Sequence, residues 1–310
     1  MIEIWSLCGL VLAGISVMSN DAVQTLGTFM ASNRKTPWWR LWLASSLVLV
    51  STILYSWFAY NGDISFGRLD KIPYIQVEWY HAMAPAVLLL LTRYGIPVST
   101  TFLVLSAFAS TVVFEKMLVK SMLGYAIAAV VAYVFWVVLS KYLDEKREVN
   151  PKHVRKWRIA QWCTTGFLWF TWLSHDLANI AVFAPRQMGA EYLIGIIVLL
   201  VATLSYVFYN QGGKIQEIVI EKSSTSYVRS ATIIDAVYAF ILLYLKQLNN
   251  IPMSTTWVFV GLLCGRELAI ATMREKKIKE VFPLVTRDFL KMMLGLSVSV
   301  VIVLVVQAIS

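Results

Sequence analysis

Two acidic residues occupy matched positions in the two halves of the chain. Asp21 stands in Ser19-Asn20-Asp21, and Asp176 stands in Ser174-His175-Asp176, 155 positions later in a chain of 310 residues. Both follow long apolar runs, so each carboxylate is expected at membrane depth, where a charge costs at least about 2.5 to 3.5 kcal/mol. An acid persists there when a cation, a proton or a polar cavity receives it. We therefore predict that both acids belong to a binding site.

The neighbours of the two acids supply further ligands. Asn20 and Gln24 flank the first acid, and His175 and Asn179 flank the second. Carboxylate, amide and freed backbone oxygens suit hard cations, while a histidine can carry a proton. The expected cation-coupling residues are Asp21, Asp176, Asn20, Gln24 and His175, with Asp21 and Asp176 as sodium ligands if sodium is the coupling ion. The alternative is that the acids only hydrogen-bond neighbouring helices.

A cluster of hydroxyl residues behind a proline also occurs twice. The copies are Ile96-Pro97-Val98-Ser99-Thr100-Thr101 and Ile251-Pro252-Met253-Ser254-Thr255-Thr256, again 155 positions apart. Proline ends one helix, and serine or threonine caps the next. A helix N-terminus with unpaired amides and three hydroxyls suits a tetrahedral oxyanion. The expected substrate-binding residues are Ser99, Thr100, Thr101, Ser254, Thr255, Thr256, Asn20 and Asn179. Simple N-capping is the alternative interpretation of each cluster.

The two motifs make physical sense together. Ionised Asp21 and Asp176 would repel phosphate or sulfate in a low-dielectric site unless a cation or a proton lies between them. The anion then binds well only when the cation is present, which is the linkage that a symporter requires. The sequence therefore predicts coupled transport, with no cofactor other than sodium or protons as the coupling ion.

Composition places the chain in a lipid bilayer. Hydrophobic residues make up 58% of it and charged residues 15%, and the mean hydropathy is +0.67, values typical of integral membrane proteins. Five apolar stretches fall in each half: 2–18, 41–60, 82–92, 102–114, 121–140, 159–173, 192–209, 231–248, 257–273 and 289–309. Several of them are shorter than the roughly 20 residues that a spanning helix needs. This predicts a helix break at each Pro-x-Ser-Thr-Thr, either between full spans or in a re-entrant hairpin.

The expected fold is an all-α integral membrane protein with two inverted-topology repeats of about five helical segments each. Duplicated motifs at a constant interval favour two half-sites that form one binding site. The predicted boundaries are 1–141 for the first repeat, 142–157 for a charged cytoplasmic linker and 158–310 for the second repeat.

Basic residues are distributed unequally between the two sides. A net charge of +9 would suggest nucleic acid as the partner of a soluble protein, but in a membrane protein the position of the cations indicates topology. Nineteen fall on the side of the linker, and five fall on the other side: Arg68, Lys71, Lys116, Lys120 and Arg186. We therefore expect a multi-pass protein of the plasma (inner) membrane with both termini extracytoplasmic and no nucleic-acid partner.

These motifs resemble those of the inorganic phosphate transporter (PiT) family. Its two halves each carry a Gly-x-Asn-Asp-x-Ala-Asn type motif and a Pro-x-Ser-Thr-Thr motif. The matching residues are Asn20, Asp21, Asp176, Asn179, Ser99, Thr100, Thr101, Ser254, Thr255 and Thr256. The resemblance implies an inverted-repeat symporter of inorganic phosphate with sodium or protons, often a homodimer. His175 and Gln24 stand where the family has asparagine. The family includes sulfate carriers, so a sulfate permease stays open as an alternative.

Other classes of protein lack support in the sequence. A membrane-embedded enzyme would need a nucleophile or metal constellation, and no His-Glu-x-x-His, paired cysteines or Gly-rich phosphate loop is present. No enzymatic activity is therefore expected. A passive anion channel would not need buried acids that repel its substrate. Two further charged residues lie in apolar stretches. Arg266 is expected to snorkel or to pair with a neighbouring acid rather than contact the anion, and Asp235 is expected at the level of the lipid headgroups.

Overall fold

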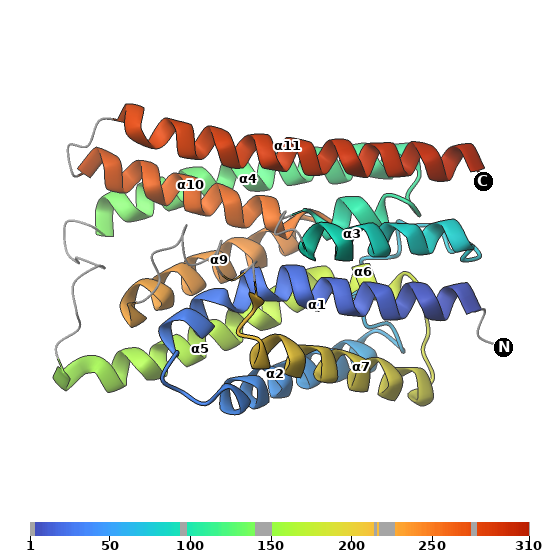
Figure 1. Cartoon of the computed structure of the whole chain (residues 1–310), viewed down its shortest axis with the longest axis horizontal. Coiled ribbons are helices and arrows are strands. Elements are labelled where there is room, and N and C mark those ends of the chain that lie inside the picture. The colour runs from blue at the N-terminus through green and yellow to red at the C-terminus, as the bar shows by residue number, and fades with distance from the viewer. Residues whose placement is uncertain are drawn as a thin grey trace.

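The regular elements of the described residues are all helical. The computed structural model describes residues 4–93, 98–139, 151–213, 216, 227–273 and 278–309. In chain order the elements are α1 (Ile4–Ser32), α2 (Trp38–Ala59), η1 (Trp79–Ala82), α3 (Met83–Arg93), η2 (Thr101–Leu105), α4 (Thr111–Leu139), α5 (Pro151–Asp176), α6 (Ala178–Ala181), α7 (Ala190–Tyr209), α9 (Val228–Leu248), α10 (Thr255–Met273) and α11 (Ile278–Ile309). Most of the long helices extend along one direction, and both termini lie at the same end (Figure 1).

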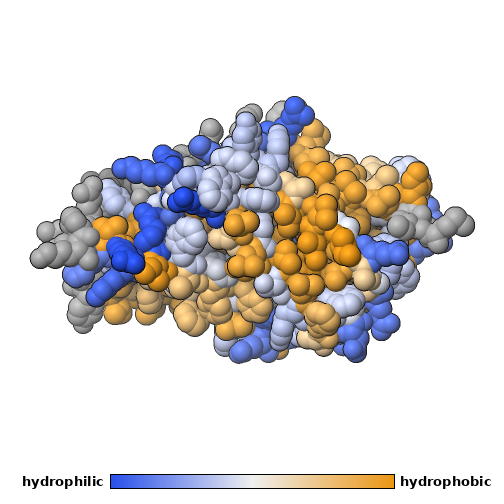
Figure 2. Space-filling view, turned by 90° about the horizontal axis from the view of Figure 1, so that it is seen from below, coloured by the Kyte–Doolittle hydropathy of each residue, from blue (hydrophilic) through white to orange (hydrophobic). Residues whose placement is uncertain are grey.

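Six of the described helices are long and apolar enough to cross a membrane, namely α1, α2, α4, α7, α9 and α10. Figure 2 shows a broad hydrophobic area on the face seen from below. Helices α2 and α7 lie on that side in Figure 1, and their exposed side chains include Leu47, Phe58, Ile194 and Val198. Large exposed apolar surfaces are rare in soluble monomers. The chain is therefore a multi-pass membrane protein, as its composition predicts.

The two hydroxyl-bearing turns approach the middle of the molecule from opposite ends. Helix α3 extends inward from the end that carries the termini, whereas α9 and α10 meet near the middle and extend toward the opposite end (Figure 1). This is compatible with inverted repeats, which remain a prediction. The halves differ in detail, because α10 continues for 19 residues after its turn and η2 for only 5.

Helix α10 packs closely along α4 because glycines face the partner backbone. A Cβ atom at Gly261 would collide with the backbone carbonyl of Tyr125, and one at Gly265 with that of Ala129. Small residues one turn apart allow helices to approach this closely in lipid. The contact holds the N-terminal end of α10, with its hydroxyl residues, against the helix that follows the first hydroxyl cluster.

The structure departs from the expected segments in two places. The stretch 102–114 is not one helix, because η2 ends at Leu105 and α4 begins at Thr111. The hydroxyl of Ser106 donates to the carbonyl of Phe102, a local bond that competes with helix continuation. The predicted linker 142–157 is helical in its last part, since Pro151 occupies the first position of α5, where proline is favoured. Residues 140–150 lie outside the described residues, as do residues 96 and 97 of the first hydroxyl motif.

Candidate functional site

The first acid lies within α1 and is bound to the first hydroxyl cluster. The hydroxyl of Thr100 donates to Oδ2 of Asp21. The amide of Asn20 donates to Oδ1 of Asp21 at 2.8 Å and to the carbonyl of Val98 at 3.0 Å. Asp21 is 2% exposed. Its two oxygens therefore both accept hydrogen bonds, and these bonds connect α1 to the turn before η2.

Gln24 joins this half-site indirectly. Its amide donates to Oδ1 of Asn20 at 3.4 Å, so it orients the amide that donates to Asp21. The side-chain amide of Gln24 therefore bonds to Asn20 and not to Asp21, and its role in cation coupling stays a prediction.

One hydroxyl of each cluster caps a helix. Oγ of Ser99 accepts from the backbone N–H of Phe102 at 3.3 Å, and Oγ of Ser254 accepts from the backbone N–H of Trp257 at 3.2 Å. The acceptor stands three residues before the donor in both copies, which is the N-cap relationship. The capping interpretation therefore holds for the serines and leaves the four threonines for other contacts.

The threonines bring the two hydroxyl clusters together. The hydroxyl of Thr101 donates to the carbonyl of Met253 at 3.1 Å, across 152 positions of sequence. The side chain of Thr256 lies next to Asp21, and that of Thr255 lies next to Asp176. Asp21 is thus approached by hydroxyls from both clusters.

The second acid is the last residue of α5 and is less fully hydrogen-bonded. The amide of Asn179 donates to Oδ1 of Asp176 at 2.9 Å. Among the described residues, Oδ2 of Asp176 and Oδ1 of Asn179 are buried acceptors without a hydrogen-bond donor. The charges of Asp21 and Asp176 also interact with each other. Two buried orphan oxygens next to a second carboxylate are a suitable site for a cation.

The ring of His175 contacts α9 and Arg68. Its Nε2 lies 2.9 Å from the carbonyl of Leu242 in α9, and Nη2 of Arg68 lies 3.5 Å from the same nitrogen. The structure therefore brings together the expected site residues except His175, which contacts α9 instead.

The assembled site is closed. Its expected residues are all buried: Asn20, Asp21, Gln24, Ser99, Thr100, Thr101, His175, Asp176, Asn179, Ser254, Thr255 and Thr256. Two pockets lie toward the ends of the molecule. One of about 690 Å³ includes Asn33, Arg34 and Lys35 beyond the C-terminal end of α1, and one of about 250 Å³ includes Ser6 and Phe183 near its start.

A polar network connects the lining of the larger pocket to α5. The amide of Asn33 donates to Oε1 of Gln161 at 3.0 Å, and Arg158 donates to Oδ1 of Asn33 at 2.9 Å. The amide of Gln161 also donates to the hydroxyl of Ser32. These bonds join the C-terminal end of α1 to the N-terminal part of α5.

Two of the five cations assigned to the side opposite the linker are buried in the structure. Arg68 is 1% exposed and Lys120 is 5% exposed. The ammonium of Lys120 donates to the carbonyl and side-chain oxygen of Asn249 at 2.8 and 2.7 Å and to the carbonyl of Ile251 at 2.9 Å. Sequence reasoning missed both, because their neighbours in the chain do not distinguish them from headgroup-level cations such as Lys71.

Asp235 is also misplaced by the sequence interpretation. It is fully buried on α9 and accepts from the hydroxyls of Thr28 at 2.6 Å and Thr165 at 2.5 Å. The expectation of a headgroup-level position is therefore wrong. The acid occurs early in its apolar stretch, but two hydroxyls from α1 and α5 satisfy its oxygens inside the helix bundle.

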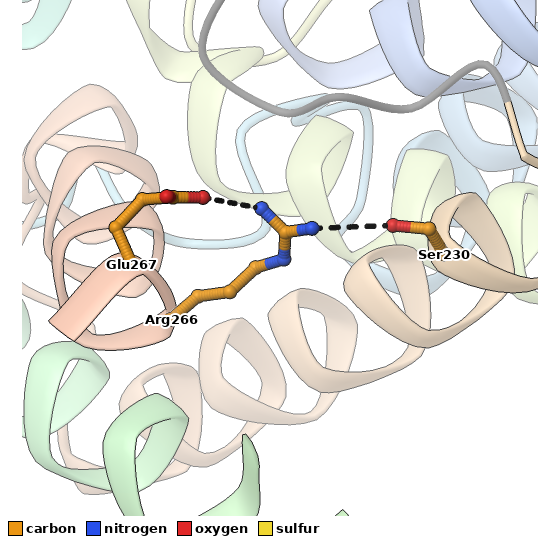
Figure 3. A network of polar contacts seen from close by, with 3 residues as sticks. All are labelled: Ser230, Arg266 and Glu267. Carbon is orange, nitrogen blue, oxygen red and sulfur yellow. Dashed lines mark hydrogen bonds and ion pairs between the residues drawn. The ribbon is translucent and has the colours of Figure 1, made fainter. Parts of the chain in front are cut away.

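Arg266 pairs with the acid beside it, as expected. Nη1 donates to Oε1 of Glu267 at 2.7 Å, and Nη2 donates to the hydroxyl of Ser230 on α9 at 3.4 Å. Figure 3 shows this three-residue arrangement between α10 and α9. Arg266 lies eleven residues beyond Thr255, or roughly 16 Å along the helix, and therefore outside the shared cluster.

Comparison with models of protein families and with curated proteins gives no match to this sequence. A solved structure titled "The sodium-dependent phosphate transporter" matches with a TM-score of 0.65 and 17% identity, over 99% of this chain and 98% of that one. The chain has the fold of a sodium-dependent phosphate transporter. The match extends over both halves of the chain, so the expected all-α membrane fold is confirmed, whereas the inverted repeats stay a prediction.

Proposed function

We propose that this protein is a symporter that carries inorganic phosphate across the membrane with sodium. The observation that carries the proposal is the bond from Thr100 to Asp21, within a cluster that also holds Asp176 and the second hydroxyl motif. The solved structure with the same fold is that of a sodium-dependent phosphate transporter, which supports phosphate as the substrate.

The hydroxyls and the N-terminus of α10 would hold the anion. Thr255 and Thr256 lie in the first turn of α10, where backbone N–H groups and the helix dipole favour negative charge. Thr100 and Thr101 would contribute from the opposite side. On arrival of phosphate, the hydroxyls can redirect their hydrogen bonds from protein oxygens to the substrate, because a hydroxyl rotates freely about its C–O bond.

The orphan oxygens of Asp176 and Asn179 fit sodium as the co-transported ion. Sodium is a hard cation that prefers carboxylate and amide oxygens, and neither atom receives a hydrogen bond in the described part of the chain. A cation there would offset the repulsion between Asp21, Asp176 and phosphate. Anion affinity would then depend on the cation, which is the thermodynamic basis of symport.

The buried site would alternate between the two ends of the molecule. The larger pocket carries Arg34 and Lys35 and would face the cytoplasm, because the excess of cations is expected there. Both termini would then be extracytoplasmic in the plasma membrane. A homodimer remains a prediction from the family resemblance.

Uptake into proteoliposomes tests the proposal. Purified protein would be reconstituted, and labelled phosphate and sulfate would be offered under an imposed sodium gradient, a proton gradient or neither. We expect uptake of phosphate that requires sodium and exceeds that of sulfate. Phosphate affinity independent of both sodium and pH would refute symport. Preferred uptake of sulfate would identify a sulfate permease, and flux without counterflow would indicate a channel.

A further inference from the structure

Arg68 is a buried guanidinium that the proposed transport steps do not yet use. It is among the largest fully buried side chains, although it lies in the segment between α2 and η1 rather than in a long helix. This segment belongs to the half of the molecule that carries both termini (Figure 1). A buried arginine keeps its charge, so its surroundings must compensate it.

Two hydrogen bonds connect Arg68 to the second half-site. Nε donates to the carbonyl of Ser174 at 2.9 Å, and Nη1 donates to the carbonyl of Ile251 at 3.3 Å. Ser174 stands two residues before Asp176, and Ile251 stands three residues before Ser254. The guanidinium therefore bridges the end of α5 that bears the acid and the turn that bears the second hydroxyl cluster.

The third nitrogen of Arg68 has a weaker contact. Nη2 lies 3.5 Å from Nε2 of His175, but the same histidine nitrogen lies 2.9 Å from the carbonyl of Leu242. The shorter contact assigns the hydrogen to Nε2, which then cannot accept from Arg68. The bridge consequently consists of two hydrogen bonds to carbonyls, and the bond to Ile251 is the longer one. Opening the bridge therefore breaks only these two bonds.

The segment that presents Arg68 is held in place by its own bonds. The carboxylate of Asp63 accepts from the backbone N–H and hydroxyl of Ser65, both at 2.7 Å, and from the N–H of Gly67 at 2.8 Å. Phe66 and Gly67 have φ of 58° and 71°, so the turn is sharply bent just before Arg68. The bonds within its own segment thus position the arginine independently of Ile251. If the bridge opened, the turn between α9 and α10 would move and Arg68 would stay.

Charges act on the same bridge. Asp176 attracts Arg68, whereas Lys120 and Lys246 repel it. Lys120 donates to the same Ile251 carbonyl from α4. The turn between α9 and α10 is therefore held by cations from two directions, and the attraction of Asp176 favours the bridged position of Arg68.

We propose that Arg68 is a positioning residue that latches the turn between α9 and α10 to α5 and keeps the site shut on the side of the termini. The role rests on the proposed phosphate symport. Loss of the latch frees this turn, opens the second half-site to that side and separates phosphate movement from sodium.

The test compares Arg68→Gln and Arg68→Lys with Arg186→Gln. Arg186 is the control, because it also donates to two carbonyls, Ile72 and Pro73 at 3.1 and 3.2 Å. The acids that act on it are Asp63 and Asp70 and not Asp21 or Asp176. Each change is made in a chain with Met253→Cys and with the native cysteines replaced. Met253 is 2% exposed, so its labelling by an impermeant thiol reagent from the side of the termini reports opening.

We expect Arg68→Gln to raise labelling and sodium-independent phosphate exchange roughly tenfold, the effect of losing a hydrogen bond from a charged donor. Arg68→Lys should be intermediate, and Arg186→Gln should match the parent. The proposal would be overturned if the Arg68→Gln variant folded, was labelled at position 253 as slowly as the parent protein and transported sodium and phosphate in the same ratio as the parent protein. If the Arg68→Gln variant does not fold, the labelling and the sodium-to-phosphate ratio of the Arg68→Lys variant decide in the same way. Labelling needs no phosphate transport, so failure of the proposed function would be seen separately.

Discussion

The hydroxyl of Thr100 donates a hydrogen bond to the carboxylate of Asp21 across 79 positions of sequence. This bond joins the two kinds of motif that recur in the chain, the acid and the hydroxyl cluster. A carboxylate that accepts from the hydroxyl of a proposed anion ligand exchanges that partner when phosphate arrives. Changing Asp21 and changing Thr100 should therefore have different effects on transport.

Neutralising either acid should strongly reduce sodium-driven uptake. Asp21→Asn and Asp176→Asn remove the charges that we propose to make anion binding depend on a cation, while the shape of the side chain is kept. We expect uptake to fall by roughly 10- to 100-fold, as for loss of a hydrogen bond to a charged group. Labelled uptake and size-exclusion profiles would be measured together, and near-normal uptake in both folded variants would contradict the mechanism.

Thr100→Val should separate the hydroxyl from the shape of the side chain. Valine keeps the branching of threonine but leaves Oδ2 of Asp21 without this donor, at a cost of about 1–3 kcal/mol. We expect a higher half-saturating phosphate concentration and a changed sodium dependence. Thr100→Ser is the control, because it retains the hydroxyl. The assignment fails if the valine and serine variants transport equally well.

Ser254→Ala should act through the cap of α10. Oγ of Ser254 accepts from the N–H of Trp257, and loss of such a cap costs about 0.5–2 kcal/mol. We expect lower thermal stability together with a higher half-saturating phosphate concentration, and Ser99→Ala should behave alike. An unchanged half-saturating concentration with lower stability would show that these hydroxyls are caps and not ligands.

Gly265→Ala should destabilise the fold, whereas Gly195→Ala should not. A Cβ at Gly265 would meet the backbone of Ala129 on α4, but one at Gly195 on α7 meets nothing within 4 Å. Overpacking costs typically about 1–3 kcal/mol, while alanine in place of a helical glycine is favourable by roughly 0.5–1 kcal/mol. Thermal unfolding in detergent would compare them, and equal midpoints would refute the close contact of α10 with α4.

The sequence by itself determined that the chain is an α-helical membrane protein and where its local motifs lie. Apolar stretches predicted helices in lipid, and the constant interval between Asp21 and Asp176 predicted matched half-sites. Serines behind prolines predicted helix caps, which Ser99 and Ser254 form. These features depend on residue type and on near neighbours in the chain, so one sequence is enough to recognise them.

Only the tertiary structure decided which long-range partners each polar group has. Arg68 and Lys120 look like headgroup-level cations in sequence, yet both reach the carbonyl of Ile251 inside the protein. Asp235 is satisfied by Thr28 and Thr165, which lie 207 and 70 positions away. A buried polar group takes whatever partner the packed helices present to it. That choice follows from helix packing in three dimensions, which the order of residues along one chain does not display.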